Sequence, residues 1–202
     1  MKYRLLSFCM AVLLLISMIS VPRIEAANST ETFKDSADTK IVKLLEALGL
    51  MEIDSETGFF WDEMPVKRSE LAKIICKMFN ISETKDASPH FTDVSDYDRA
   101  YIETAIRNGY MSGYDNEKFG PDDYVTNIQL IKTFVTALGG DAAAQSQGGY
   151  PGGYITIGNM LGLLKGKAVA NENISRRIDV ANIIYTALHA DVLEIAGSVE
   201  II

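Results

Sequence analysis

A pattern that recurs three times along the chain limits the possible folds more than any other feature. Each copy begins with a short apolar stripe at helical spacing that ends at a glycine, and continues through a turn-rich loop to a second stripe. The three glycines, Gly49, Gly109 and Gly162, lie 60 and 53 residues apart. One helix pair cannot bury its apolar face alone, so the copies must share a core, stacked in line or closed around a pseudo-threefold axis. We therefore predict an all-α fold.

The apolar stripes predict six helices. In chain order the stripes are Ile41–Leu48 and Leu71–Met78, Ile102–Ile106 and Leu130–Leu138, and Ile157–Leu161 and Val180–Leu188. Before the third copy, Gly148–Tyr154 holds four glycines and a proline but follows no strand pattern. We therefore interpret this segment as a turn and not as a phosphate-binding loop.

The N-terminus has the layout of a secretory signal peptide, with two basic residues, the apolar run Leu5–Val21 and a small residue at Ala26. We predict cleavage after Ala26. An uncleaved anchor is disfavoured because the run is short for a bilayer, and lipidation at Cys9 because a large residue precedes it. Cleavage leaves Cys76 as the only cysteine, so no intramolecular disulfide can form.

The net charge narrows the choice of partners. The chain of 202 residues has 19 Lys and Arg against 27 Asp and Glu, a formal charge of −8. Loss of the signal peptide removes three basic residues and one acidic residue, which takes the charge to −10. Such a chain lacks the basic surface of a nucleic-acid binder, and an anionic membrane would repel it after cleavage.

The middle copy carries an ordered series of motifs. Phe91-Thr92-Asp93-Val94 is followed by Gly109-Tyr110, Phe119-Gly120-Pro121 and Val125-Thr126. This order resembles the S-layer homology (SLH) repeat, which runs Phe-x-Asp-Val, Trp-Ala, a glycine-terminated helix, Gly-Tyr, Phe-x-Pro and Ile-Thr-Arg-Ala-Glu. The residues that we assign to the structural motif are Phe91, Asp93, Gly109, Gly113, Phe119, Pro121 and Thr126.

The other two copies resemble the same repeat. Val66–Leu71 and Ser175–Asp179 stand where the Ile-Thr-Arg-Ala-Glu segment would be, and the glycine-rich approach to the third copy is similar to SLH arrays in clostridial surface proteins. The resemblance implies three helix-loop-helix repeats in a pseudo-threefold, three-pronged helical bundle. The predicted parts are a signal peptide (1–26), a linker (27–38), repeats at 39–86, 87–147 and 148–191, and a C-terminal tail (192–202).

The resemblance also implies a function. SLH arrays bind secondary cell-wall polysaccharide, often pyruvylated, or another peptidoglycan-linked polymer, non-covalently and without a cofactor. It implies a secreted protein at the cell wall or S-layer surface. In the family, the motif arginine faces an acidic saccharide. Physically, arginine is unfavourable in a first helical turn, but its planar fork suits a carboxylate outside the helix.

The candidate polysaccharide-binding residues come from the first and third copies. They are Arg68, Glu70, Arg177, Asp179 and Trp61. Arg176 replaces Arg177 if Ser175 is taken as the helix cap. Asn127 stands at the arginine position of the second copy, so we expect that groove to bind an acidic sugar weakly or not at all.

Several residues have two interpretations. Trp61 is either a saccharide platform or a core residue, and Arg99 occupies the place of the family's Trp-Ala tryptophan. Asp93 either orients a ligand or, as we favour, caps the turn into the next helix. Thr126 with Gln129 fits a capping box, and Phe60 and the two motif phenylalanines are interpreted as core residues.

Other classes of function are less well supported. The sequence has no zinc-protease helix, nucleophile elbow or Walker loop, so we expect no enzyme. The acidic turn 115–123 does not match an EF-hand, and no metal site is predicted. A degenerate SLH array that acts as a structural or protein-interaction module remains open, because the second copy lacks the arginine and the tryptophan. Whether the chain is a truncated anchor or a free adaptor also remains open.

Overall fold

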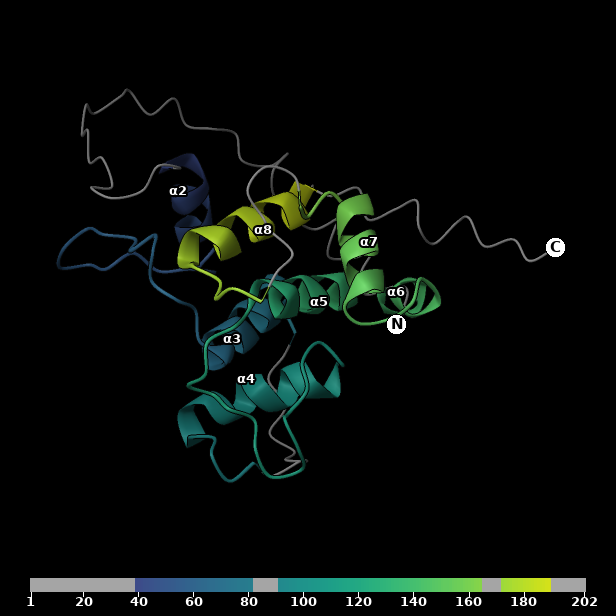
Figure 1. Ribbon diagram of the computed structural model, residues 1–202. Helices are drawn as coiled ribbons and strands as arrows, with labels where there is room; N and C mark the ends of the chain where they lie inside the picture. Colours follow the sequence, from purple (N-terminus) through teal and green to yellow (C-terminus); the bar gives the residue numbers. More distant parts are fainter. Residues whose placement is uncertain (1–38, 82–90, 165–171, 190–202) are drawn as a thin grey trace. The chain divides into compact units, whose positions relative to one another are not determined.

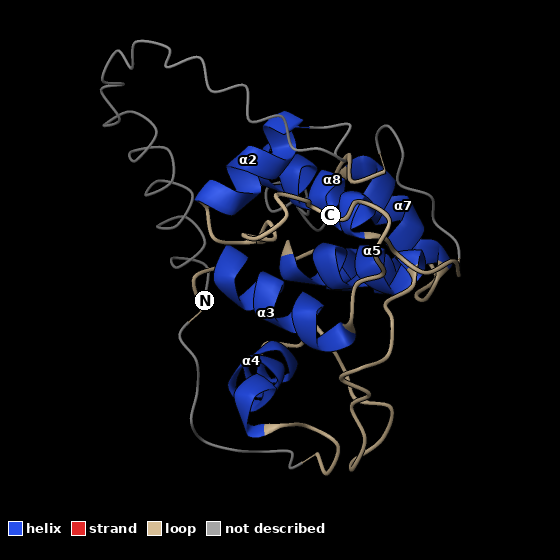
Figure 2. Ribbon diagram, turned by 90° about the vertical axis from the view of Figure 1, so that its left-hand side faces the viewer, coloured by secondary structure: helices blue, strands red, loops and turns tan. Residues whose placement is uncertain are grey.

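A computed structural model describes residues 39–81, 91–164 and 172–189. All of them belong to the compact unit Phe33–Ile202, and the predicted signal peptide, linker and C-terminal tail lie outside the described residues. In these ranges the chain forms seven helices and no strand, which confirms the predicted all-α class (Figure 2). The helices are α2 (Thr39–Ala47), α3 (Arg68–Met78), α4 (Asp96–Arg107), α5 (Asn127–Ala137), α6 (Asp141–Ser146), α7 (Gly152–Met160) and α8 (Arg177–His189).

Most helices pack against helices near them in the sequence, and one contact joins the two ends of the described chain. Helix α3 contacts α4, α7 contacts both α5 and α6, and α2 contacts α8 (Figure 1). The contact between α2 and α8 brings the first and last helices of the array together. The six apolar stripes therefore share one core, as the repeat pattern predicts.

The three glycines that define the repeat end their helices in the same way. Gly49, Gly109 and Gly162 have φ of 65°, 74° and 73°, a left-handed conformation that favours glycine. In each case the next residue's amide donates to the carbonyl five positions before it, at 2.9 Å. This is the Schellman arrangement, which satisfies carbonyl groups at the end of each helix.

The segments that lead into α3, α5 and α8 meet in a closed ring of backbone hydrogen bonds. The Val66 amide donates to the Ser175 carbonyl at 3.1 Å, Ser175 to Val125 at 2.8 Å, and Val125 back to Val66 at 3.0 Å. All three residues are buried. A linear stack would leave the first and third segments apart, whereas this ring joins all three. The three-pronged outline and the repeat boundaries stay predictions.

Two stripe residues differ from expectation. Leu48 is 50% exposed and Met160 is 68% exposed, although both were assigned to apolar stripes. Leu48 lies just past the end of α2, and Met160 is the last residue of α7. Helical periodicity no longer sets the direction of a side chain at these ends.

The glycine-rich segment Gly148–Tyr154 is only partly a turn. Helix α7 begins at Gly152, inside the segment interpreted as a turn, and the short helix α6 before it was not predicted. A Cβ atom at Gly153 would collide with the carbonyl of Ala144 in α6. Glycine therefore serves here to bring two helices into close contact, a use that looks the same in sequence as a turn.

Candidate functional site

The start of α3 positions Arg68, the first residue of that helix. Lys67 before it has extended backbone, and the Arg68 amide donates to the Asp123 carbonyl at 2.9 Å. The side chain is thereby directed toward the segment between α4 and α5. There its Nε donates to the Phe119 carbonyl at 3.1 Å and its Nη2 to the Ser112 carbonyl at 2.7 Å. Arg68 is only 6% exposed.

Two aromatic rings flank the Arg68 guanidinium. Its Cζ lies 4.8 Å from the centroid of Tyr114 and 4.5 Å from that of Phe119. Burial lowers the pKa of Arg68, while the charges of Tyr114, Asp123 and Asp93 oppose this shift. Arginine nevertheless stays protonated in proteins. Within the described ranges Nη1 makes no hydrogen bond, so this arginine is held in place with one nitrogen still able to donate.

A groove of about 210 Å³ opens beside this guanidinium, and we name it the Arg68 groove. Lys132 on α5 supplies a second cation, and its Nζ lies 5.8 Å from the Tyr150 ring centroid. None of the lining residues is a carboxylate, so the charges that line this groove are both positive. They are Arg68, Leu71, Tyr110, Met111, Ser112, Tyr114, Val125, Gln129, Lys132, Thr133 and Tyr150.

Arg177 repeats this arrangement at the start of α8. Its Nε donates to the Phe60 carbonyl at 2.8 Å and its Nη2 to the Glu52 carbonyl at 2.7 Å. The guanidinium lies over the Phe60 ring, 4.6 Å from the centroid. One contact differs, because Nη1 donates to the Glu70 carboxylate at 2.8 Å. Arg177 is therefore paired with an acid inside its own groove.

The groove beside Arg177, named the Arg177 groove, has a volume of about 260 Å³. Its lining holds three cations and three carboxylates, so it is balanced in charge. Lys73 lies 3.9 Å from the Glu52 carboxylate. Burial raises the pKa of Glu70, although Arg177 acts in the opposite direction. The lining residues are Leu50, Met51, Glu52, Ser69, Glu70, Lys73, Ile74, Lys77, Tyr97, Asp98 and Arg177.

Helix α5 begins with Asn127, whereas α3 and α8 each begin with an arginine. The Asn127 Oδ1 accepts a hydrogen bond from the Ser175 hydroxyl at 2.8 Å. The loop that would face it in the third copy includes residues 165–171, which lie outside the described residues. The expectation that this groove binds weakly stays untested.

The structure brings together only some of the predicted binding residues. Arg177 and Glu70 form an ion pair, and Arg68 lies in the other groove. Asp179 forms an ion pair with Arg176 at 2.9 Å, and Arg176 forms a second ion pair with Glu63. These two carboxylates raise the pKa of Arg176. Neither Asp179 nor Trp61 lines either of the two grooves.

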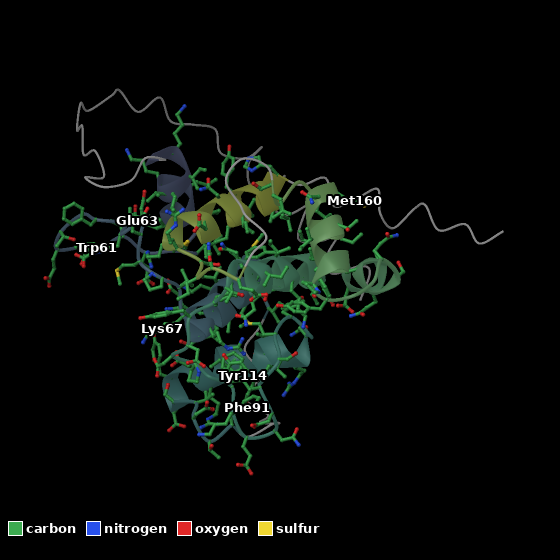
Figure 3. The ribbon with its side chains drawn as sticks, viewed as in Figure 1. Trp61, Glu63, Lys67, Phe91, Tyr114 and Met160 are labelled. Carbon is green, nitrogen blue, oxygen red and sulfur yellow. The ribbon has the colours of Figure 1, made fainter. Side chains whose placement is uncertain are left out.

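Trp61 is not a core residue. It is 42% exposed, and its ring packs against Phe59 with the centroids 4.9 Å apart. Figure 3 shows Trp61 on the left of the view, well away from Tyr114 and Phe91 in its lower part. Of its two interpretations, the core residue is therefore wrong, and the saccharide platform stays a prediction.

The phenylalanines and Gly113 of the motif build the loop behind the Arg68 groove. Phe60, Phe91 and Phe119 are all at most 3% exposed, which confirms them as core residues. The Phe91 and Phe119 rings pack 5.7 Å apart. A Cβ atom at Gly113 would lie 2.6 Å from the Phe91 ring, so only glycine fits there.

The polar residues of the motif stabilise backbone. Thr126 and Gln129 form the predicted capping box of α5. The Pro121 carbonyl accepts from the Ser69 amide at 3.1 Å and so links the loop to α3. The favoured interpretation of Asp93 is wrong, because Ser95 caps α4. The Asp93 carboxylate instead accepts from the amides of Phe119 and Gly120 at 3.0 and 2.9 Å. Burial acts to raise its pKa, but these hydrogen bonds outweigh it and the pKa is lowered.

Sequence reasoning missed Lys132, Ser112 and the three groove tyrosines, Tyr110, Tyr114 and Tyr150. Lys132 lies one turn after the capping-box residue Gln129, as Lys73 does after Glu70. That shared spacing was the available signal, since residues three apart lie on the same face of a helix. The described ranges contain no group of three or more His, Cys, Asp or Glu side chains able to hold a metal ion. Among the helices described, none is long and apolar enough to cross a bilayer.

Comparison with known proteins gives the following matches. Residues 90–130 match the family model of the S-layer homology domain. The chain is 26% identical over 175 residues to "Middle cell wall protein" of Brevibacillus brevis, covering 84% of this chain and 16% of that protein. It is 28% identical over 162 residues to "Surface layer protein" of Brevibacillus choshinensis, covering 77% and 14% respectively. The chain thus spans a small part of the length of these relatives.

Proposed function

The chain carries an S-layer homology domain at residues 90–130, and from this premise we propose that it attaches non-covalently to the bacterial cell envelope by binding an anionic secondary cell-wall polysaccharide. The domain and the two relatives indicate a location at the cell wall or surface layer and a role in cell-surface anchoring. The relatives are named for the cell wall and for the surface layer.

The Arg68 groove is the observation that carries the proposal. It presents two cations, an amide from Gln129 and three tyrosine side chains, with no carboxylate in its lining. Charge-assisted hydrogen bonds from Arg68 and Lys132 suit a sugar carboxylate. Aromatic rings supply apolar faces on which a sugar ring can pack. Because the whole chain is acidic, affinity for an acidic polymer must come from such a local group of cations.

The experiment is co-sedimentation with purified cell-wall sacculi, either intact or stripped of their non-peptidoglycan polymer. We expect the protein to sediment with intact sacculi and to stay in solution with stripped ones. Lys132→Glu should weaken binding at least tenfold. Lys73→Glu is the matched control, since Lys73 occupies the same position on α3 in the Arg177 groove. Equal binding to stripped sacculi, or equal losses in both variants, would refute the proposal.

A second candidate function is a structural or protein-interaction module without saccharide binding. The ion pair between Arg177 and Glu70 favours it, because one of the two grooves has its arginine already neutralised. Arg99, at the place of the family's tryptophan, likewise pairs with Asp96 and Glu103. This candidate predicts that wild type fails to sediment with intact sacculi.

A further inference from the structure

The first copy carries an exposed tryptophan where the second copy has a glycine. Phe60 and Phe119 are equivalent, because the carbonyl of each accepts a hydrogen bond from the Nε of an arginine that starts a helix. The residues that follow them are Trp61 and Gly120, with φ of 60° and 74°. This left-handed conformation costs free energy for a bulky side chain, and glycine avoids that cost. Strain held at an exposed ring is typical of a functional position.

Contacts within the loop around Trp61 fix the orientation of its ring, and we name residues 54–63 the Trp61 loop. The Asp54 carboxylate accepts hydrogen bonds from the Thr57 amide at 2.8 Å and from the Trp61 indole, which can only donate. The ring packs against Phe59 with the centroids 4.9 Å apart, yet 42% of Trp61 stays exposed. Because the indole N–H is engaged by Asp54, a ligand would meet the face of the ring.

The Trp61 loop is acidic. It contains no basic residue and four carboxylates, which are Asp54, Glu56, Asp62 and Glu63. Arg176 pairs with Glu63 but also with Asp179, so two acids surround one cation there. In the part of the chain that the structure describes, no lysine or arginine forms an ion pair with Asp54 or Glu56. These carboxylates would repel an acidic saccharide and attract a cation.

We propose that the Trp61 loop docks a basic segment of another protein, with an arginine or lysine side chain over the exposed indole face. Tryptophan is the best aromatic residue for such a contact, and carboxylates beside it add to the attraction. The loop is separate from both grooves, whose linings contain none of its residues, and Figure 3 shows Trp61 and Glu63 far from Tyr114 of the Arg68 groove. The inference therefore does not depend on the proposed function.

The test uses the fluorescence of Trp61, which is the only tryptophan of the chain and so reports on this surface alone. The probe is a short peptide of alternating arginine and glycine, compared with its citrulline counterpart, which keeps the shape and lacks the charge. A neutral N-acetylglucosamine oligomer tests the alternative of a saccharide platform. We expect a saturable response to the arginine peptide that weakens as salt is added, and none to the other two probes.

Variants are compared by the fluorescence anisotropy of a dye-labelled arginine peptide, because Trp61→Gly removes the intrinsic probe. Trp61→Gly should fold, since glycine adopts the same conformation in the second copy, and should bind about tenfold more weakly. Glu56→Lys should weaken binding about threefold, and Glu117→Lys is the matched control without effect. Glu56 and Glu117 occupy equivalent turns, in which Asp54 or Asp115 accepts a hydrogen bond from their amides.

Several results would overturn the inference. They are no response to the arginine peptide, equal responses to the two peptides, a folded Trp61→Gly that binds like wild type, and equal effects of the two glutamate variants. A response to the oligomer alone would overturn it in favour of a saccharide platform at Trp61. Circular dichroism checks the fold of each variant. If Trp61→Gly does not fold, the comparison of Glu56→Lys with Glu117→Lys decides.

Discussion

The Arg68 groove and the Arg177 groove are built from the same parts and differ in what fills them. In each, an arginine that starts a helix reaches the loop of another segment, donates to two carbonyls and covers a buried phenylalanine. The Arg68 groove then adds serine and glutamine, whereas the Arg177 groove adds two glutamates. The comparison teaches that the same backbone arrangement can carry a groove with two cations and no carboxylate, or a groove that is balanced in charge.

Arg68 and Arg177 serve mainly to hold backbone segments together. Two of the nitrogens of each guanidinium hold a loop that comes from a distant part of the chain, so each arginine links two repeats. The same side chain then offers its remaining donor capacity to the groove. We therefore expect binding and folding to be coupled at these two positions, and a variant of Lys132 separates the two roles better than variants of the arginines.

The largest expected effect is a loss of folding stability when Arg68 or Arg177 is replaced by alanine. Arg68→Ala should lower the free energy of unfolding by about 3 kcal/mol, because it leaves two buried carbonyls without their charged donor. Arg177→Ala should cost about 2 kcal/mol, since its side chain is 15% exposed and water can replace part of the loss. Urea unfolding measures both. An unchanged urea midpoint in Arg68→Ala would contradict the stabilising role assigned to Arg68.

A glycine substitution tests the loop that supports only the Arg68 groove. Gly113→Ala should cost about 2 kcal/mol, because the new methyl group would press on the Phe91 ring and on the Asp115 carbonyl, 2.6 and 2.8 Å away. Gly152→Ala is the control, since nothing lies within 4 Å of the added atom there. Thermal unfolding of the two variants should separate them clearly, and equal midpoints would show that the loop is not tightly packed.

The pH dependence of stability tests the Arg177 groove alone. Burial raises the pKa of Glu70 above its ordinary value of 4.5, so the native state binds this proton more tightly than the unfolded chain does. Stability from this group is therefore greatest at low pH and falls as the pH rises from 4.5 through the folded pKa. Glu70→Gln should lack this component, and its stability should decline less over that window than that of wild type. Parallel pH profiles would argue against the burial of Glu70.

The smallest effect is expected at the exposed ion pair between Lys67 and Asp122, next to the backbone ring. Lys67 lies 2.7 Å from Asp122, and their side chains are 49% and 84% exposed. Such pairs contribute little, so Lys67→Ala should change stability by less than about 0.5 kcal/mol and leave saccharide binding unaltered. A larger change in binding would place the ligand outside the two grooves.

Much of the fold could be predicted from the sequence. The buried stripes of α3 and α5, the helix-ending glycines and the capping box of α5 all depend on local rules, and each agrees with the structure. Helix α6 could not be predicted, because six residues with three alanines carry too little pattern. The sequence predicts a turn at Gly153, because a glycine needed for close packing looks the same in sequence as a turn glycine.

The candidate grooves were less predictable, for a physical reason. The sequence indicated Arg68 and Arg177 as ligand-binding residues, but their partners Ser112, Phe119, Phe60 and Glu52 lie on other segments of the chain. Which loop faces which arginine depends on the order of the segments around the backbone ring, and helical periodicity does not contain that order. The pairing of Glu70 with Arg177 depends on it in the same way.

The central claim is that an acidic sugar binds in the Arg68 groove, and side-chain NMR tests it most directly. The spectra would follow the Arg Nε–H and Lys ζ signals during titration with a pyruvylated disaccharide. The account predicts saturable shifts at Arg68 and Lys132, with Arg177 and Lys73 unmoved. Shifts centred on Arg177 and Lys73, or no shift at any of the four, would contradict it.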